Sequence, residues 1–295
     1  MAMKRLVINA DDFGWSGAVT EGILGAHLRG IVTSTTLMAN LEGAEEALAR
    51  ARREAPTLGI GLHLTLTEGR PLAPPAEVEA LVDGGGRLRR SLAGLFCGVR
   101  RSRRIRQAVA RELEAQAAWA HDHGLKITHL DSHKHVHLHP ALLPEVIALA
   151  RRHGVRAVRT TVETDFPNLG RLLPKQWGTR ERVAQWVRAR MARRWGRAAQ
   201  RAVRQAGLIT TDWFFGVRAT GGLSGPLLCH LMRHAPGGTG EVMAHPGLSE
   251  DRGARTTRLA ESRPRELEAV EDPAVRAAAE ARGWRLVTFE ELTRE

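Results

Sequence analysis

Residues 6–14 read LVINADDFG, an apolar run that ends in two adjacent carboxylates and a glycine. The run is typical of a buried strand, and Ser16 can cap a helix that ends near Arg29, before Gly30. The same alternation of strand and helix continues along the chain. Apolar runs predict further strands at 31–38, 58–67, 126–130, 155–160, 213–217, 241–244 and 285–289, with helices at 42–54, 105–121, 142–153 and before residue 283.

Repeated strand–helix units favour a parallel sheet covered by helices. About seven or eight such units fit a distorted (β/α) barrel, a relative of the TIM barrel with a mostly parallel sheet. We expect a single domain, residues 1–295, with two basic helical insertions at about 87–111 and 171–206. Sites in such folds lie at the carboxyl ends of the strands, so polar residues at those points are the candidates for function.

The composition excludes several classes of protein. The 295 residues are 43% hydrophobic and 26% charged, as in an ordinary globular domain. Cys97 and Cys229 are too few for a disulfide framework, and no apolar run approaches the roughly 18 residues of a membrane span. The first residues lack the apolar core of a signal peptide, so we expect a cytoplasmic protein.

Most of the net charge of +12 lies in the two basic segments. Residues 87–111 contain nine arginines and no acid, and residues 171–204 contain ten arginines and one lysine against one glutamate. The rest of the chain is therefore mildly acidic. Two such segments predict either a local contact with an anionic surface, such as lipid headgroups or nucleic acid, or two solvated faces.

Polar residues follow the predicted strands. Asp11 and Asp12 come directly after the first strand, where one carboxylate can bind a metal while the other acts as a base. A turn or a helix cap would explain this pair equally well on its own. His63 lies in the alternating run 58–67, where a lone histidine is more often a hydrogen-bonded residue of the barrel.

Residues 128–140 read THLDSHKHVHLHP and contain five histidines. Four of them, from His133 to His139, alternate with other residues, so an extended chain would place them on one face. This density is hard to explain by packing and predicts a metal site. Lys134, which stands between two of the histidines, is expected to face away from its neighbours.

Two more residues stand at predicted strand ends. His245 is followed by Pro246 and Gly247, a rigid turn that suits a general acid. Turn formation alone would also explain this sequence. Arg159, at the end of the predicted strand 155–160, can bind substrate, pair with an active-site carboxylate, or form a surface ion pair.

Six motifs follow one another along the chain: NADDFG at 9–14, GIVTSTT at 30–36, GIGLH at 59–63, THLDSHKHVH at 128–137, FFG at 214–216 and EVMAHPG at 241–247. Their order and spacing resemble those of the YdjC-like carbohydrate deacetylase family, which includes chitooligosaccharide deacetylase. The resemblance extends from about residue 4 to 290, apart from the two basic segments. It implies a distorted barrel and metal-dependent removal of acetyl groups from N-acetylated sugars.

The resemblance also implies roles for individual residues. Asp12, His63 and His133 match the metal ligands, Asp11 matches the catalytic base, and His245 resembles the general acid of related polysaccharide deacetylases. This set of donors can bind one divalent ion, Zn²⁺ or Mg²⁺, which polarises an amide carbonyl and acidifies water. We expect four further residues to position the ligands or bind the substrate: Asp131, His135, His137 and Arg159.

The second basic segment departs most from the family pattern. Its apolar residues recur every three or four positions, with arginines between them: Val183, Val187, Met191, Trp195, Ala198 and Ala202. We expect a basic amphipathic helix, which either lies on an anionic membrane surface or packs on the core with its arginine face in solvent. Contact with a membrane would suit a glycolipid substrate, as in the hopanoid-biosynthesis-associated subgroup that some members of the family resemble.

Two other functions stay open at this point. A glycoside hydrolase would use Asp11 and Asp12, although such acids usually come from separate elements that flank the bond. A non-catalytic basic module would bind lipid or nucleic acid and use its histidines structurally. The deacetylase is the favoured reading, with an N-acetylated sugar or glycolipid as substrate, no nucleic-acid partner and, as the family suggests, a homodimer.

Overall fold

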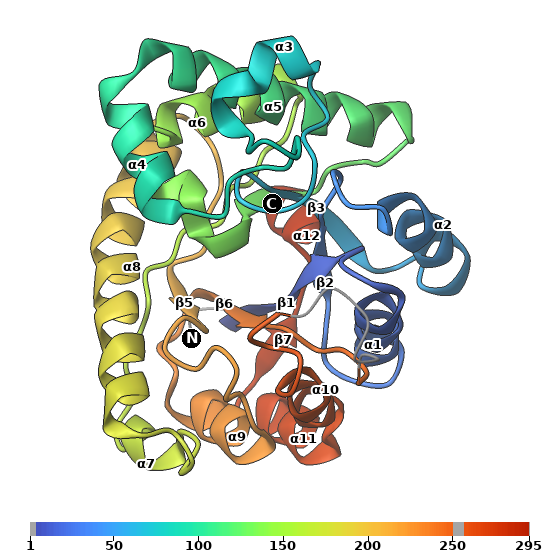
Figure 1. The fold of residues 1–295 in the computed structure, drawn as a ribbon. Helices are drawn as coiled ribbons and strands as arrows, with labels where there is room; N and C mark the ends of the chain where they lie inside the picture. Colours follow the sequence, from blue (N-terminus) through green and yellow to red (C-terminus); the bar gives the residue numbers. More distant parts are fainter. Residues whose placement is uncertain (1–3, 250–256, 295) are drawn as a thin grey trace.

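The computed structural model describes residues 4–249 and 257–294. Within them, parallel strands form one curled sheet in the order β4-β3-β2-β1-β6-β5, and β7 pairs with the start of β1 (Figure 1). The strands are β1 (Lys4–Phe13), β2 (Ser34–Leu37), β3 (Gly59–Leu64), β4 (Leu130–Ser132), β5 (Trp213–Phe215), β6 (Thr239–Ala244) and β7 (Trp284–Leu286). The predicted distorted barrel with a mostly parallel sheet is confirmed.

Helices surround this sheet, with α1 and α2 at the right of Figure 1, α9 to α11 below, α5 and α6 above, and α8 along the left side. The longer ones are α1 (Gly17–Leu28), α2 (Ala44–Glu54), α4 (Leu92–Arg101), α5 (Arg103–Asp122), α6 (Leu143–Arg152), α8 (Thr179–Gln205), α9 (Gly225–His234), α10 (Arg263–Glu271) and α11 (Pro273–Ala281). Short helical turns are α3 (Pro75–Val78), η1 (Glu79–Leu81), η2 (His133–Leu138), α7 (Leu169–Leu172) and α12 (Phe289–Arg294). No helix in these residues is both long and apolar enough to cross a bilayer.

Local sequence explains the first βα unit. All of β1 from Leu6 onward is buried, as its apolar run predicts. The side chain of Ser16 accepts a hydrogen bond from the backbone N–H of Val19 at 3.2 Å, so the predicted cap of α1 is confirmed. The parallel register then places residues that are far apart in sequence at one edge: Ala10 pairs with Ala244, and His63 pairs with Asp131.

The predicted strand 155–160 is wrong. In this stretch only isolated bridges form, between Leu130 and Val158 on one side and between Ala157 and Ile209 on the other. The chain here crosses from β4 to β5, and single bridges replace a continuous ladder, so the barrel closes irregularly. The strand predicted at 126–130 is also displaced, because regular pairing with β3 begins only at Leu130.

Helix α8 packs on the barrel through a face that the sequence did not indicate. Its buried residues are mostly small: Gln185, Ala189, Ala192, Gly196, Ala199 and Val203. A Cβ atom on Gly196 would lie 2.3 Å from the carbonyl of Thr161, which shows how closely the helix approaches this backbone. The predicted stripe is divided: Trp195 and Ala202 pack against the core, whereas Val183 and Val187 lie exposed. The helix thus packs on the barrel and leaves most of its arginines in solvent.

Candidate functional site

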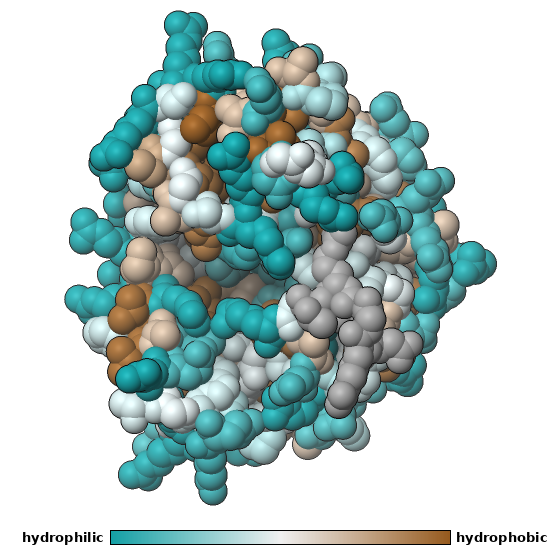
Figure 2. All heavy atoms as spheres, viewed as in Figure 1, coloured by the Kyte–Doolittle hydropathy of each residue, from teal (hydrophilic) through white to brown (hydrophobic). Residues whose placement is uncertain are grey.

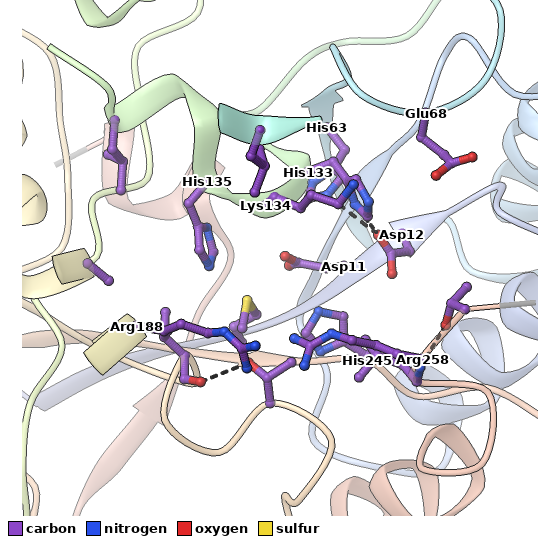
Figure 3. Close-up of a pocket in the computed structure, with 18 of the residues that line it drawn as sticks. Asp11, Asp12, His63, Glu68, His133, Lys134, His135, Arg188, His245 and Arg258 are labelled. Atoms are coloured by element: carbon purple, nitrogen blue, oxygen red, sulfur yellow. Dashed lines mark hydrogen bonds and ion pairs between the residues drawn. The ribbon is translucent and has the colours of Figure 1, made fainter. Parts of the chain in front are cut away.

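A cavity of about 560 Å³ opens at the carboxyl ends of the strands. The five residues expected to bind metal or catalyse the reaction all line it: Asp11, Asp12, His63, His133 and His245. Figure 3 shows His63, His133 and Asp12 gathered on one side of Asp11, with His245 on the other side. The fold thus brings together the last residues of β1 and β3, the residue after β6 and the start of η2.

Asp12, His63 and His133 form a compact group of donors. The Oδ1 atom of Asp12 lies 3.6 Å from Nε2 of His63 and 3.2 Å from Nδ1 of His133, and all three donor atoms lie within 4.8 Å of one another. Two ligands at about 2.1 Å from one ion in tetrahedral geometry are about 3.4 Å apart. The residues present therefore fit a single divalent ion.

Asp131 orients the first of these imidazoles. Its Oδ1 atom accepts a hydrogen bond from Nδ1 of His63 at 2.7 Å, which leaves Nε2 facing Asp12. Burial lowers the pKa of His63, but the charges of Asp131, Asp11 and Asp12 outweigh it and raise the pKa to about 9. Asp131 thus bonds the nitrogen of His63 that faces away from Asp12, an arrangement that can orient an imidazole toward a metal.

Asp12 is fixed by an arginine that the sequence analysis did not single out. Nη2 of Arg263 donates to Oδ2 of Asp12 at 2.6 Å, so Oδ1 is left for the two imidazoles. Burial raises the pKa of Asp12, but the charge of Arg263 and the contact with His133 hold it well below its usual value. Asp12 also adopts a positive φ of 71°, a strained conformation that turns its side chain toward the cavity.

Arg159 is completely buried and binds three carboxylates at the back of the cavity. Its guanidinium donates to both oxygens of Asp11, at 2.7 and 2.8 Å, contacts Asp131 at 2.5 Å, and donates through Nε to Glu241 at 2.6 Å. Burial raises the pKa of Asp11, but the Arg159 charge outweighs this and lowers it. Of the contacts considered for Arg159, the structure shows the pair with the Asp11 carboxylate, and its burial excludes a surface ion pair.

His245 leaves β6 and enters the cavity from the side opposite the donor group. Its backbone N–H donates to Oε2 of Glu266 at 2.7 Å, and its Nδ1 lies 3.8 Å from the same oxygen. This Nδ1 is buried and has no hydrogen-bond partner among the described residues. The imidazole is therefore held by its backbone and by packing, with the carboxylate of Glu266 beside it.

The expected extended segment of histidines is wrong. Residues 133–138 form the 3₁₀ helix η2, in which Lys134 and His135 have positive φ values, so the four histidines point in different directions. His135 lines the cavity, whereas His137 is buried and bonds Ser132 Oγ at 2.6 Å and the Arg159 carbonyl at 3.1 Å. Burial lowers the pKa of His135 to about 3 and that of His137 to about 4.

Lys134 also differs from expectation, since it lines the cavity instead of facing away from the site. Its Nζ donates to Oγ1 of Thr67 at 3.2 Å. The positive φ of 58° at Lys134 turns the chain so that this side chain lies near His133. A period-two pattern could not predict this turn, because it assumes an extended backbone.

One wall of the cavity is apolar and comes from the two basic segments. Phe96 of α4 stacks on His139 with ring centroids 4.5 Å apart, and Trp195 of α8 meets both rings edge-on at 5.6 and 5.5 Å. Leu92 and Met191 extend this wall. The two segments that interrupt the motif pattern thus shape the cavity beside the donor group.

Several site residues escaped the sequence analysis. Arg263 and Glu266 lie in α10 without a motif around them, and only the folded chain brings them to Asp12 and His245. Glu241 stood inside a quoted motif but was given no role. Glu68, Arg188 and Arg258, which line the cavity (Figure 3), carry no local signal either.

Comparison with known proteins gives a consistent picture. The family model described as YdjC-like protein matches residues 5–281. A protein named carbohydrate deacetylase from Geobacillus stearothermophilus is 34% identical over 98% of this chain and 98% of its own length. Another of that name, from Brevibacillus brevis, is 48% identical over 51% of this chain and 57% of its own length. A solved structure from Enterococcus faecalis covers 99% of both chains, with a TM-score of 0.75 and 28% identity.

Proposed function

Since this chain belongs to the YdjC-like protein family, we propose that it is a metal-dependent carbohydrate N-deacetylase that removes the acetyl group from an N-acetylhexosamine. The observation that supports this most directly is the convergence of Asp12, His63 and His133 with Asp11 and His245 on one cavity. The Geobacillus stearothermophilus relative named carbohydrate deacetylase, which is matched over 98% of its length, supports the same reaction.

One divalent ion is proposed to bind to Asp12, His63 and His133. Two imidazoles favour Zn²⁺, whereas the carboxylate also suits Mg²⁺. When bound, the ion supplies Lewis-acid chemistry, which polarises the amide carbonyl and makes water more acidic. Asp131 and Arg263 position the ligands, since each bonds the atom of His63 or Asp12 that faces away from the donor group.

Asp11 and His245 carry the proton transfers in this proposal. Asp11 stays ionised at neutral pH because Arg159 lowers its pKa, and its oxygens retain lone pairs that can accept the proton of an attacking water. His245, on the other side of the cavity, donates a proton to the departing amine, with Glu266 behind its ring. His135 lies within reach of a sugar in the same cavity and is assigned to substrate binding.

The structure argues against the alternative function of a glycoside hydrolase that uses Asp11 and Asp12. A glycoside hydrolase needs one carboxyl group whose pKa is raised, so that it can protonate the leaving oxygen. Burial tends to raise the pKa of Asp11 and of Asp12, but Arg159 and Arg263 lower the two values instead. Neither of these two residues can then act as the acid near neutral pH.

The finer identity of the substrate is also a proposal. The apolar wall of Leu92, Phe96, Met191 and Trp195 suits an apolar group attached to the sugar, which favours a glycolipid such as an N-acetylglucosaminyl hopanoid. A cytoplasmic location, with α8 in peripheral contact with an anionic membrane, is consistent with such a substrate. The homodimer stays a prediction from the resemblance.

The test combines metal analysis of the purified protein with acetate release. The substrates are N-acetylglucosamine, its β-linked disaccharide and a lipid-linked N-acetylglucosamine. We expect about one divalent ion per chain and release of acetate that stops after chelation and returns when metal is restored. Release of a reducing sugar without acetate, or acetate release that is indifferent to chelation, would overturn the proposal.

A further inference from the structure

The outward face of α8 exposes an unusual amount of apolar surface. Among the described residues, six large apolar side chains are exposed, and four of these lie on the first half of α8. They are Val183, Trp186, Val187 and Met191, each between 41% and 53% exposed, and we refer to them as the α8 strip. Figure 2 shows brown side chains in this region, at the left, beside the central hollow.

The strip follows from how the helix packs. The small residues from Ala189 to Val203 occupy the face toward the barrel, so residues that are half a turn away, such as Val183 and Val187, point outward. Within the described part of the chain, Val183 stays 53% exposed and Val187 stays 41% exposed. Large exposed apolar patches of this kind mark sites of interaction with a partner or a membrane.

Unpaired arginines border the strip. Five exposed arginines on α8 form no ion pair with any described carboxylate: Arg190, Arg193, Arg194, Arg197 and Arg201. Glu181 is the helix's one acid, and Arg190 lies over the ring of Trp186 at 5.6 Å. Arginines that carry no carboxylate partner are available to bind an anionic surface.

We propose that this face of α8 docks on an anionic lipid bilayer, with the α8 strip in the acyl region and the arginines at the headgroups. An amphipathic helix of this composition binds membrane interfaces through both contributions. A second copy of the chain fits less well, because a two-fold contact would place arginines against arginines. Nucleic acid would pair with the arginines but would leave Val183 and Val187 without an apolar partner.

The docking surface continues into the cavity. Met191 belongs to the α8 strip and also lines the cavity, where Trp195 and Phe96 extend the apolar surface inward. Docking would therefore bring the cavity mouth to the bilayer surface. Where it concerns the substrate, this inference rests on the proposed deacetylase function, and it selects a lipid-linked N-acetylated sugar that enters from the membrane.

The test measures co-sedimentation of the full chain with vesicles at low salt. Phosphatidylcholine vesicles that contain phosphatidylglycerol are compared with phosphatidylcholine alone. One variant replaces Arg190, Arg194 and Arg197 with Gln, and a second replaces Val183 and Val187 with Ser. The matched control removes three exposed arginines of the other basic segment, at positions 100, 101 and 103.

We expect the wild-type protein and the control to bind only the anionic vesicles. Loss of three arginines should weaken that binding about a hundredfold, at about 1 kcal/mol for each. The serine variant should also bind weakly, while both α8 variants retain full acetate release from a soluble N-acetylated sugar. Binding by the control as weak as that of the α8 variants would contradict the assignment to α8.

Two results of the vesicle assay would overturn the inference: a wild-type protein that does not bind anionic vesicles at low salt, or a serine variant that binds them as tightly as wild type does. The inference would also fail if the α8 strip forms a dimer interface. Sedimentation equilibrium would show this as a dimeric wild-type protein and a monomeric serine variant. Salt-sensitive binding to DNA that the serine variant retains, without vesicle binding, would assign the arginines to nucleic acid. Because vesicle binding is read without turnover, failure of the deacetylase proposal would appear separately, as absent acetate release from a protein that still docks.

Discussion

The guanidinium of Arg159 meets the carboxylate of Asp11 end-on, with Nη1 at 2.8 Å from Oδ2 and Nη2 at 2.7 Å from Oδ1. Such a bidentate pair fixes the plane of the carboxylate as well as its charge. It also keeps Asp11 ionised, at the expense of its basicity. The proposed role of Asp11 as a base therefore depends more on the position of its carboxylate than on its pKa. A neutral side chain of the same shape is the sharpest test of that role.

Asp11→Asn should retain metal and fold but lower kcat by about a hundredfold or more, the usual contribution of a positioned acid or base. The amide has the shape of the carboxylate, yet it cannot accept the proton of the attacking water. The measurement is steady-state acetate release together with metal content and the midpoint of thermal unfolding. Turnover near the wild-type value would show that Asp11 is a structural partner of Arg159 and not the base.

The histidines of η2 provide a matched pair for the metal site. His133→Ala should remove most of the bound metal and most activity, because its Nδ1 lies 3.2 Å from Oδ1 of Asp12 within the donor group. His135→Ala, two residues away and in the same cavity, should keep its metal and change mainly KM. His63→Ala and Asp12→Ala should behave like His133→Ala. Metal content is read on the purified proteins, and full occupancy in His133→Ala would disprove the ligand assignment.

The role of His245 is tested through the leaving group. His245→Ala should lose activity strongly on an N-acetylhexosamine, whose amine needs a proton as it departs. The loss should be much smaller on an N-acetyl substrate whose amine is a better leaving group, because such an amine departs with less help. Metal content should not change, since His245 lies outside the donor group. An equal loss on both substrates would assign His245 to binding and not to proton donation.

Local patterns in the sequence predict the barrel, and the resemblance of six motifs to a family indicates the residues of the candidate site. Asp11 and Asp12 are visible as polar residues after an apolar run, and His63 as a polar residue in an alternating one, and the parallel sheet brings these strand ends together. The course of η2 was not predictable, since it depends on positive φ values at Lys134 and His135 that no period reveals. Contacts such as that of Arg263 with Asp12, 251 residues apart, exist only in the folded chain.

The packing of α8 shows a second limit of pattern analysis. The apolar period indicated the face that contains Val183 and Val187. The helix instead packs on the barrel through its face of small residues, because Ala192 and Gly196 allow a close approach to the backbone at Thr161. Large apolar residues usually mark a buried face, but in the first half of α8 the large apolar residues Val183 and Val187 are exposed. Apolar residues that bind a partner outside the chain stay exposed in the isolated protein, so their pattern does not identify the face that packs on the core.

Gly196→Ala should destabilise the protein, although helix propensity alone predicts a gain of about 1 kcal/mol. The new Cβ would lie 2.3 Å from the Thr161 carbonyl, so α8 must move outward, at a cost of about 1–3 kcal/mol typical of overpacking. The free energy of unfolding in urea measures the change. Ala198→Ser, on the exposed side of the same helix, is the control and should change stability by less than about 0.5 kcal/mol. Equal stability of Gly196→Ala and wild type would mean that the close contact is absent in solution.

We expect the stability of the protein to depend on pH through Glu163, a residue outside the donor group. Its buried carboxylate accepts N–H groups of Gly216, Val217 and Arg218 at 3.0–3.4 Å, beside the chain that leaves β5. Burial outweighs these hydrogen bonds and raises the pKa of Glu163 to about 7, from an ordinary value of 4.5. Between these two values the folded protein binds a proton that the unfolded chain has lost, so stability falls as pH rises through this window.

Glu163→Gln removes this titration while an amide oxygen still accepts an N–H group. The free energy of unfolding of the variant, relative to that of wild type, should therefore increase by an amount on the order of 3 kcal/mol as pH rises from about 5 to about 8. Glu241, whose pKa burial also raises to about 7, is present in both proteins and cancels in the comparison. The measurement is urea unfolding at the two pH values. If the difference in the free energy of unfolding between variant and wild type is the same at both pH values, Glu163 titrates normally. Solvent would then reach its carboxylate, or its N–H contacts would offset burial.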